Sequence, residues 1–244
     1  MAEAREADVR PRKRPLADAI VTLAETPDHV AGIDARFKQI ARLAADRVGA
    51  ADYASVTTLR GREYTIVAAS SEVAIAVDEA QISDRVGPSL QALDTGEPVG
   101  VPDVAATMDW PGFHALAPTL GLQASVSVPL HMGRGAPGAV LNLYGRDDVA
   151  MQPLIFGVAQ LYAVRHELTI GTTPAAPADP GAEELLGGYA EALAVRATIQ
   201  LAITLLAAGR GSSPGDAYAH LCLRAAAAGT LLGEAATTVV EQHL

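Results

Sequence analysis

Apolar residues recur at every third or fourth position over the first fifty residues of the chain, a spacing that predicts helices. The first stripe consists of Leu16, Ile20 and Leu23. The second consists of Ile33, Phe37, Ile40, Leu43, Ala44 and Val48. Thr26, which Pro27 follows, predicts the break between the two helices, because proline fits badly inside a helix. Residues 1–14 are polar and charged, so we expect a flexible tail there.

After Gly49 the pattern changes to runs of β-branched and alternating residues, which predict strands joined by short polar turns. The expected strands are 53–59, 64–69, 123–131 and 137–145, which form two hairpins. The expected helices are 88–95, 112–120 and about 151–168. An antiparallel sheet flanked by helices is an α+β fold, which we assign to residues 15–170.

Prolines among alanines characterise residues 171–181 and predict a semi-rigid linker. Beyond it, seam positions advance alternately by four and three residues, the heptad spacing of a helix that packs along a partner. These positions are Leu185, Tyr189, Ala192, Arg196, Ile199, Ile203 and Leu206. Ser213 is a suitable N-cap for a second helix and Thr230 for a third. Residues 182–244 are therefore expected to form a small all-α three-helix module.

Composition and charge indicate what kind of protein this is and which partners it repels. Half of the 244 residues are hydrophobic, which is ample for a folded core, and the formal net charge of −10 repels nucleic acids and anionic membranes at long range. The single cysteine, Cys222, excludes an intramolecular disulfide and favours the cytoplasm. The N-terminus has no apolar signal core. Residues 110–133 carry no formal charge, but their three prolines argue against a membrane span.

No catalytic or metal-binding motif is present in the sequence. It contains no nucleophile elbow, no histidine pair at zinc-ligand spacing and no Asp/Asn-rich calcium loop. Its six histidines are scattered at spacings that fit no ligand set. We therefore expect neither an enzyme nor a metal protein.

Several segments of the first domain resemble, in order, the motifs of the GAF domain family. These segments are Gly87–Gly96, Val101–Asp103, Gly121–Leu130 and Gly138–Gly145. The resemblance covers about residues 15–170. It implies a sensing fold with a small-molecule pocket between the sheet and the segment at about 103–120.

The candidate ligand-pocket residues are Asp103, Trp110, Phe113 and His114, which lie in a loop-rich segment of the kind that often carries ligand contacts. The alternative for Trp110 and Phe113 is packing beneath a long loop, the common role of large apolar side chains. Both interpretations stay open at this point. The ligand itself is unknown.

The cofactors that some GAF domains hold are not expected here. A covalent bilin needs a cysteine near the pocket, and Cys222 lies in the other domain. Haem needs an axial ligand such as His114 or His131, and one histidine on an apolar segment is a weak signal. His131, at the end of a predicted strand, is expected to face solvent. No cofactor is therefore predicted, and a ligandless structural domain remains an alternative.

The helical region resembles the ANTAR domain family through residues 192–199, 217–221, 234–236 and 239–240. Members of that family bind structured RNA, typically paired hairpins in a leader transcript, prevent transcription termination and dimerise through the long helix. The resemblance therefore implies an RNA partner and a homodimer. It implies Arg196, Arg210 and Arg224 as the RNA-binding residues.

This chain departs from the ANTAR pattern at residues 201–204, Cys222, Leu231 and Gly233, where family members commonly carry a Gln-Ala-Lys-Gly run or basic residues. From residue 182 onward three arginines stand against six acidic residues, and few cations mean weak RNA binding. Two functions follow. One is a cytoplasmic signal-responsive regulator whose output acts in transcription antitermination. The other is a dimeric signalling adaptor whose helical module serves dimerisation or protein interaction.

Overall fold

The computed structural model of the chain describes residues 13–28, 30–134, 137–165 and 179–243. Most of the expected tail and most of the expected linker lie outside the described residues. The fold is built on a five-stranded sheet in the order β2-β1-β5-β4-β3, and all its neighbouring strands are antiparallel. The strands are β1 (Tyr53–Arg60), β2 (Glu63–Ala69), β3 (Val99–Val101), β4 (Ala124–His131) and β5 (Pro137–Gly145).

Both predicted hairpins are confirmed, and one strand pairing joins them into a single sheet. β1 pairs with β5, with Val56 opposite Leu141. The short strand β3 adds to the other side of β4, with Gly100 opposite Val126. The α+β architecture expected from the alternating pattern is therefore the one that the chain adopts.

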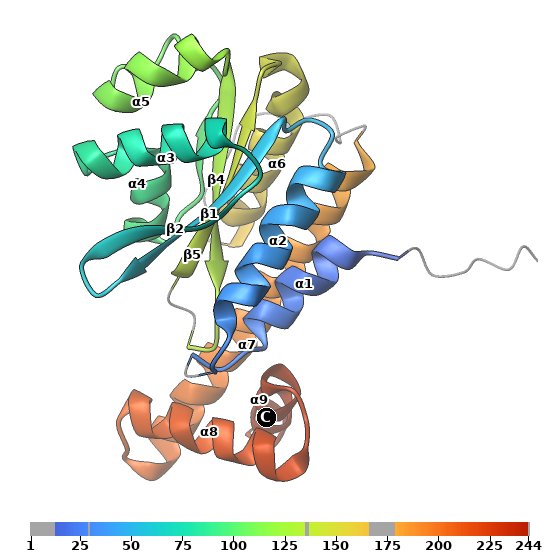
Figure 1. Ribbon diagram of the computed structural model, residues 1–244. Coiled ribbons are helices and arrows are strands. Elements are labelled where there is room, and N and C mark those ends of the chain that lie inside the picture. The colour runs from blue at the N-terminus through green and yellow to red at the C-terminus, as the bar shows by residue number, and fades with distance from the viewer. Residues whose placement is uncertain (1–12, 29, 135–136, 166–178, 244) are drawn as a thin grey trace, which may run out of the picture.

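Helices cover both faces of this sheet (Figure 1). One face is covered by α1 (Pro15–Ala24), α2 (Ile33–Arg47), α6 (Asp148–Arg165) and the first half of α7 (Pro180–Arg210). The opposite face is covered by α3 (Glu72–Asp84), α4 (Pro88–Thr95), α5 (Pro111–Leu116) and the 3-10 turn η1 (Ala117–Leu120). Each face thus has its own core.

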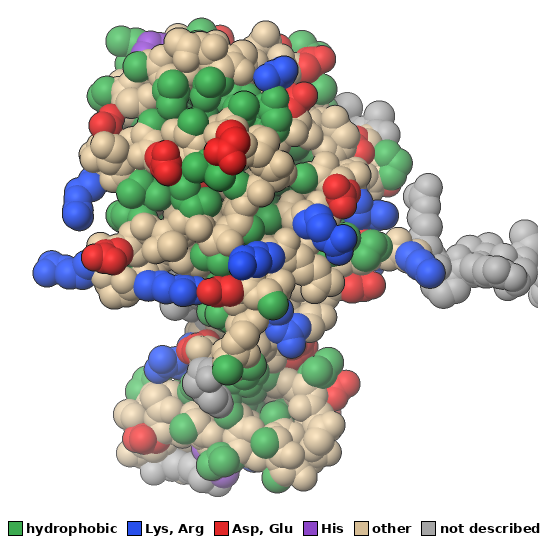
Figure 2. Space-filling model, viewed as in Figure 1, with side chains coloured by type: hydrophobic (Ala, Val, Ile, Leu, Met, Phe, Trp, Pro, Cys, Tyr) green, Lys and Arg blue, Asp and Glu red, His purple; other side chains and the backbone are tan. Residues whose placement is uncertain are grey.

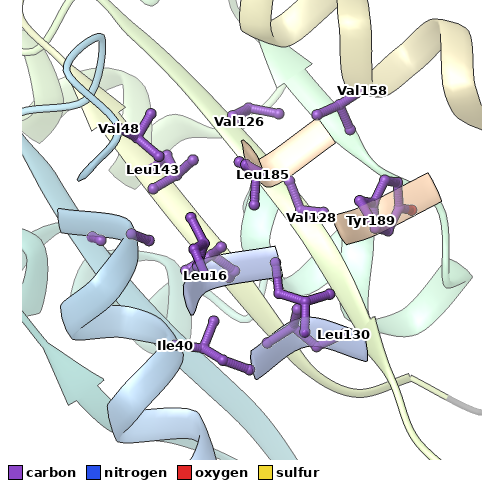
Figure 3. Close-up of a cluster of buried hydrophobic side chains, with 14 of the residues drawn as sticks. Leu16, Ile40, Val48, Val126, Val128, Leu130, Leu143, Val158, Leu185 and Tyr189 are labelled. Atoms are coloured by element: carbon purple, nitrogen blue, oxygen red, sulfur yellow. The ribbon is translucent and has the colours of Figure 1, made fainter. Parts of the chain in front are cut away.

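The core beneath α1, α2, α6 and α7 is almost wholly aliphatic. Alternate residues of β4, among them Val126 and Val128, point into it together with Leu143 of β5 (Figure 3). Leu16 and Leu185 meet these side chains from α1 and α7. Because side chains of a strand alternate between faces, the intervening residues of these strands face the second core.

Helix α3 is absent from the elements predicted above, for a physical reason. Its buried side carries Asp78 and Gln81 beside Ala74 and Val77, so it shows no apolar stripe. Ser71 caps the helix by accepting a hydrogen bond from the Ala74 amide at 3.3 Å.

The heptad seam expected on the long helix is occupied within the chain. In α7, Leu185, Tyr189 and Ala192 belong to the core shared with α1 and the sheet. Farther along, Ile199 and Ile203 belong to a separate core formed with α8 (Pro214–Ala228) and α9 (Leu232–Glu241). The partner that the seam requires is therefore supplied by this chain, and the seam itself is not free for a second copy.

The three-helix module consists of the second half of α7 with α8 and α9. It lies at one end of the sheet domain, and α7 runs from the sheet domain into the module (Figure 1). Ser213 caps α8 as predicted, accepting a hydrogen bond from the Asp216 amide at 3.2 Å. The predicted cap of α9 is wrong by one residue: Leu231, rather than Thr230, takes the N-cap position. There Glu234 accepts a hydrogen bond from the Leu231 amide at 3.2 Å.

One helix among the described residues, spanning Pro180–Gly209, is long and apolar enough by length and composition to cross a membrane, with a mean hydropathy of 1.6. In the structure this helix packs against α1, α8 and α9. It also carries the buried Glu184. Within its most apolar 18 residues, 33% are buried inside the protein.

Candidate functional site

The two aromatic residues chosen from the sequence pack against each other in the second core. Trp110 precedes α5 and is 8% exposed, while Phe113 within α5 is fully buried. Their ring centroids lie 6.3 Å apart with an interplanar angle of 87°, the edge-to-face arrangement. This geometry fits the packing role of the two rings.

The other two chosen residues do not join them in one site. Asp103 is exposed, and its Oδ1 accepts hydrogen bonds from the amides of Ala105 and Ala106 at 2.9 and 3.2 Å. It lines a surface groove of about 450 Å³ beside η1 that Trp110, Phe113 and His114 do not line. His114 is half-buried, with Nδ1 3.3 Å from the Val104 carbonyl oxygen. Asp103 therefore supports a turn rather than the aromatic cluster.

A polar cluster that the sequence analysis did not find lies buried between α3 and the sheet. We call it the Asp78 cluster. Its members are Ser55, Thr57, Asp78, Gln81, Asn142 and Tyr144. Four of the six, Thr57, Asp78, Asn142 and Tyr144, lie within hydrogen-bonding distance of at least two other members through side-chain atoms. All six are at most 1% exposed. They come from β1, α3 and β5, so the sheet and its helical cover jointly build the cluster.

Asp78 is the hydrogen-bond acceptor at the centre of this cluster. The Tyr144 hydroxyl donates to Asp78 Oδ1, which also lies 3.3 Å from Asn142 Nδ2. Thr57 Oγ1 donates to Oδ2 at 3.4 Å. Gln81 Nε2 donates to the Tyr144 hydroxyl at 3.1 Å, which extends the network along α3.

The electrostatics of the cluster follow from its burial. Removal from water raises the pKa of Asp78 to about 6, although the hydrogen bonds that it accepts act in the opposite direction. Burial, with the neighbouring Asp78 carboxyl, raises the pKa of the Tyr144 hydroxyl well above its ordinary value. Tyr144 therefore stays protonated at neutral pH and donates a hydrogen bond to Asp78, whose own pKa is about 6.

Two buried serine hydroxyls adjoin the cluster without a hydrogen-bond partner among the described residues. They belong to Ser89 and Ser125. The Ser89 amide donates to Gln81 Oε1 at 2.9 Å, and Ser125 lies opposite Tyr144 in the β4–β5 pairing. A buried hydroxyl without a partner costs about 1–3 kcal/mol, so such groups are well suited to bind a polar ligand.

The signal for this cluster is present in the strands, but it is ambiguous. Polar residues alternate with apolar ones at Ser55 and Thr57 of β1 and at Ser125 and Ser127 of β4. In an antiparallel sheet this alternation ordinarily marks a face in water. Here α3 and α4 cover that face, so its polar residues lie inside the protein.

A protein-family model decides the identity of this first domain. The model of the GAF domain matches residues 31–161, more than half of the chain. The chain belongs to the GAF domain family. GAF domains are usually sensors rather than catalysts, and the described residues include no group of three or more acidic, histidine or cysteine side chains able to hold a metal ion.

Solved structures similar to the chain include three proteins of low sequence identity. The GAF domain region of a putative membrane protein from Geobacter sulfurreducens PCA is 14% identical, with a TM-score of 0.40, and the match covers 67% of this chain and 93% of that one. A type II free methionine-R-sulfoxide reductase from Thermoplasma acidophilum is 16% identical, with a TM-score of 0.38, and the match covers 64% of this chain and 98% of that one. The A. aeolicus nlh2 GAF domain in an inactive state is 12% identical, with a TM-score of 0.41, and the match covers 60% of this chain and 88% of that one. No curated protein matches the chain.

No family model matches the helices that follow the GAF domain, where the predicted RNA-binding arginines lie. Arg196 is half-buried, with Nη1 3.4 Å from His131 Nε2 at the end of β4. His131 is only 4% exposed, so the expectation that it faces solvent is wrong. Arg224 donates to Gln242 Oε1 at 3.1 Å. The side chain of Arg210 lies outside the described residues.

The helical module is fastened to the GAF domain by a polar junction. Asp28, in the α1–α2 loop, accepts a hydrogen bond at 2.9 Å from Nε of Arg134, in the β4–β5 turn. The Asp28 amide donates to the Tyr218 hydroxyl of α8 at 3.1 Å, and the Arg134 guanidinium lies 5.3 Å from the centre of the Tyr218 ring. Farther along, the Gly233 amide of α9 donates to Glu25 Oε2 at 2.5 Å. The junction thus joins two loops of the GAF domain to both short helices.

Cys222 lies beside this junction in α8. It is half-buried, and burial raises the pKa of its thiol. A thiol with a raised pKa holds less thiolate and reacts slowly, which fits a residue that packs against the core of the helical module.

Proposed function

We propose that this protein is a cytoplasmic, signal-responsive regulator whose GAF domain binds a small polar molecule and controls the helical module. The observation that carries this proposal is the continuity of α7. Leu185 and Tyr189 of α7 pack in the GAF core, and Ile199 and Ile203 of the same helix pack in the module. A displacement of α7 by the sensor is therefore transmitted to α8 and α9.

The Asp78 cluster is the proposed sensing site. It combines a carboxyl that titrates near neutral pH with amide and hydroxyl groups, and two buried hydroxyls beside it have no partner among the described residues. Groups of this kind recognise a small ligand that both donates and accepts hydrogen bonds. Asp103, Trp110, Phe113 and His114 are then supporting residues around the site rather than its ligands.

The surface of the helical module supports the signalling adaptor as its output. Its two cations with described side chains, Arg196 and Arg224, contact His131 and Gln242. Nucleic-acid affinity rises with the number of phosphates that cations neutralise, so a module with so few cations is better suited to a protein partner. The exposed Leu223 and Leu231, 68% and 54% exposed, supply apolar contact area.

RNA binding in transcription antitermination is the second candidate, favoured by the resemblance of residues 192–240 to the ANTAR domain. A titration of paired-hairpin leader RNA at several salt concentrations distinguishes the two. Binding that weakens steeply with salt, and is lost when Arg210→Ala is combined with Arg224→Ala, supports the antitermination regulator. Undetectable binding at low salt supports the adaptor.

A homodimer is part of the proposal, and its interface differs from the seam expected from the sequence. The outer side of α7 presents a second series of residues at heptad spacing, and all of them are exposed. This series is Ala194, Ala197, Leu201, Thr204 and Ala208. Light scattering on the full chain tests it: Leu201→Glu should give monomers, whereas Leu223→Glu on α8 should leave the dimer intact.

Binding to the sensor is tested by a thermal-shift screen of small polar molecules. A true ligand raises the melting temperature of the wild-type chain in proportion to the logarithm of its concentration. The shift should disappear in Asp78→Leu and persist in Asp103→Ala. A screen in which the same molecules stabilise both variants equally contradicts a site at Asp78.

A further inference from the structure

Strand β2 forms one edge of the sheet and has a free side. It pairs with β1 along one side, and no strand of the described chain lies along the other. Because backbone amides and carbonyls of an antiparallel strand point alternately to its two sides, half of those of β2 are directed outward. A free edge of this kind can accept an additional strand from another molecule.

A groove runs beside this edge, between β2 and α2. Its volume is about 450 Å³. It is lined by Lys38, Ala41, Arg42, Ala45 and Asp46 of α2 and by residues 67–70 at the end of β2. The small side chains of Ala41 and Ala45 leave room between the helix and the strand, while Lys38 and Arg42 extend into solvent along the rim.

The groove lies in a basic region of an acidic protein. α2 and the β1–β2 turn carry six cations and three acids within a chain whose net charge is −10. The cations are Arg36, Lys38, Arg42, Arg47, Arg60 and Arg62, and the acids are Asp34, Asp46 and Glu63. Lys and Arg side chains gather across the middle of this face of the molecule (Figure 2). Arg60 pairs with Asp34, and Arg47 with Glu184, whereas Lys38 and Arg42 form no ion pair with any described residue.

We propose that the edge of β2 and its groove bind an acidic, extended peptide segment of a partner protein, which adds to the sheet as a sixth strand. The partner backbone pairs with the outward-facing groups of β2. Its carboxylates meet Lys38 and Arg42, and its small or apolar residues face the alanines of α2. This interaction goes beyond the sensing role of the GAF domain and would give the regulator a docking site separate from the helical module.

The positive charge beside the groove favours an acidic peptide over a second copy of the chain as the bound partner. Pairing the β2 edges of two copies would bring Lys38 and Arg42 of one copy close to the same cations of the other, and like charges placed together oppose association. An acidic segment reverses the sign of that interaction. Strand addition also explains why the free edge and the cations lie together, since backbone pairing supplies affinity and the charges supply selection.

The experiment uses the full chain and a fluorescent ten-residue peptide in which Glu alternates with Val and Thr. Fluorescence polarisation should detect binding. The double variant Lys38→Glu with Arg42→Glu should weaken it about tenfold or more, because two attractive contacts become repulsive. The matched double variant Lys13→Glu with Arg224→Glu makes the same change in net charge away from β2 and the groove, and it should bind the peptide as the wild type does.

Backbone pairing is tested with chemically altered peptides, so that no change in the protein fold is involved. N-methylation of the alternate residues whose amides face β2 should abolish binding, while N-methylation of the other alternate residues should preserve it. Amide resonances of Tyr64 and Ile66 should shift on peptide addition. Three results would overturn the proposal: equal binding by both methylated peptides, equal loss in both double variants, or binding of single-stranded RNA or anionic vesicles at this groove in place of the peptide.

Discussion

Arg47 and Glu184 are joined by an ion pair of 2.6 Å that fastens α7 to α2. Glu184 Oε1 also accepts hydrogen bonds from the Leu16 and Ala17 amides, at 2.6 and 3.4 Å. These are free amides of the first turn of α1, so an acid of α7 caps a helix 168 residues earlier in the chain. One side chain thereby holds α1, α2 and α7 together.

Replacing Glu184 by alanine should lower the free energy of unfolding by about 3 kcal/mol, because the variant loses the cap and leaves Arg47 without its partner. The exposed Glu183 next to it is the matched control, and Glu183→Ala should change stability by less than about 0.5 kcal/mol. Urea unfolding followed by circular dichroism measures both. Equal losses in the two variants would show that the capping contact contributes nothing.

The stability of the GAF domain should depend on pH through Asp78. Its pKa in the folded chain is about 6, against an ordinary value of 3.8. Below about pH 4 the carboxyl is protonated in both states, and above about pH 6 it is ionised in both, so the stabilisation present at low pH is lost as the pH rises between these limits. A shift of about two pKa units corresponds to about 3 kcal/mol.

The variant Asp78→Asn isolates this effect, since its side chain stays neutral at every pH. Its free energy of unfolding, relative to that of the wild type, should rise by about 3 kcal/mol between pH 4 and pH 7. Urea unfolding of both proteins across this range provides the measurement. A difference between them that does not vary with pH would show that Asp78 titrates alike in the folded and unfolded chains.

The elements of the fold follow from periodicity wherever one side of an element is apolar and the other polar. The stripe of Ile33, Phe37 and Ile40 predicts α2, and the alternation around Val126 and Val128 predicts β4. The same periodicity does not predict α3, because its residue Asp78 is buried rather than exposed. Periodicity assumes that polar residues face water, and a buried polar site violates that assumption.

The candidate site was predicted less well, for a related reason. Trp110, Phe113 and His114 stand out in a sequence because large residues are rare in loops, and the structure uses the two aromatic rings for packing. The Asp78 cluster consists of small polar residues that are common in any sequence. Its members are spread along the sequence from residue 55 to residue 144. Only the pairing of β1 with β5 brings Ser55 close to Asn142. Local patterns cannot carry information of that kind.

The packing role of Phe113 can be measured directly. Phe113→Ala removes a fully buried ring and should lower the free energy of unfolding by about 3–5 kcal/mol. Met108, in the same segment, is 78% exposed, so Met108→Ala should cost less than about 0.5 kcal/mol. If Phe113→Ala proved as stable as Met108→Ala, the ring would not be part of the core, and a role in ligand binding would regain support.

The junction between the sensor and the helical module should open in the variant Gly133→Ala. Gly133 has a φ of +38°, and a Cβ atom added there would lie 2.2 Å from both Asp28 Oδ1 and the Tyr218 hydroxyl. No adjustment of the new methyl group relieves both contacts, so either Asp28 or Tyr218 must move. Because Asp28 holds Arg134 as well as Tyr218, its displacement releases the β4–β5 turn from α8.

Gly61→Ala is the matched control for this variant. Gly61 has a φ of +66°, so alanine meets backbone strain of about 1 kcal/mol there too, but its Cβ would meet no atom within 4 Å. Hydrogen exchange measured by mass spectrometry should therefore become faster in α8 and in the α1–α2 loop of Gly133→Ala, and should stay at the wild-type rate there in Gly61→Ala. Unchanged exchange of α8 in both variants would show that α7 alone holds the module in place, and that the polar junction does not couple it to the sensor.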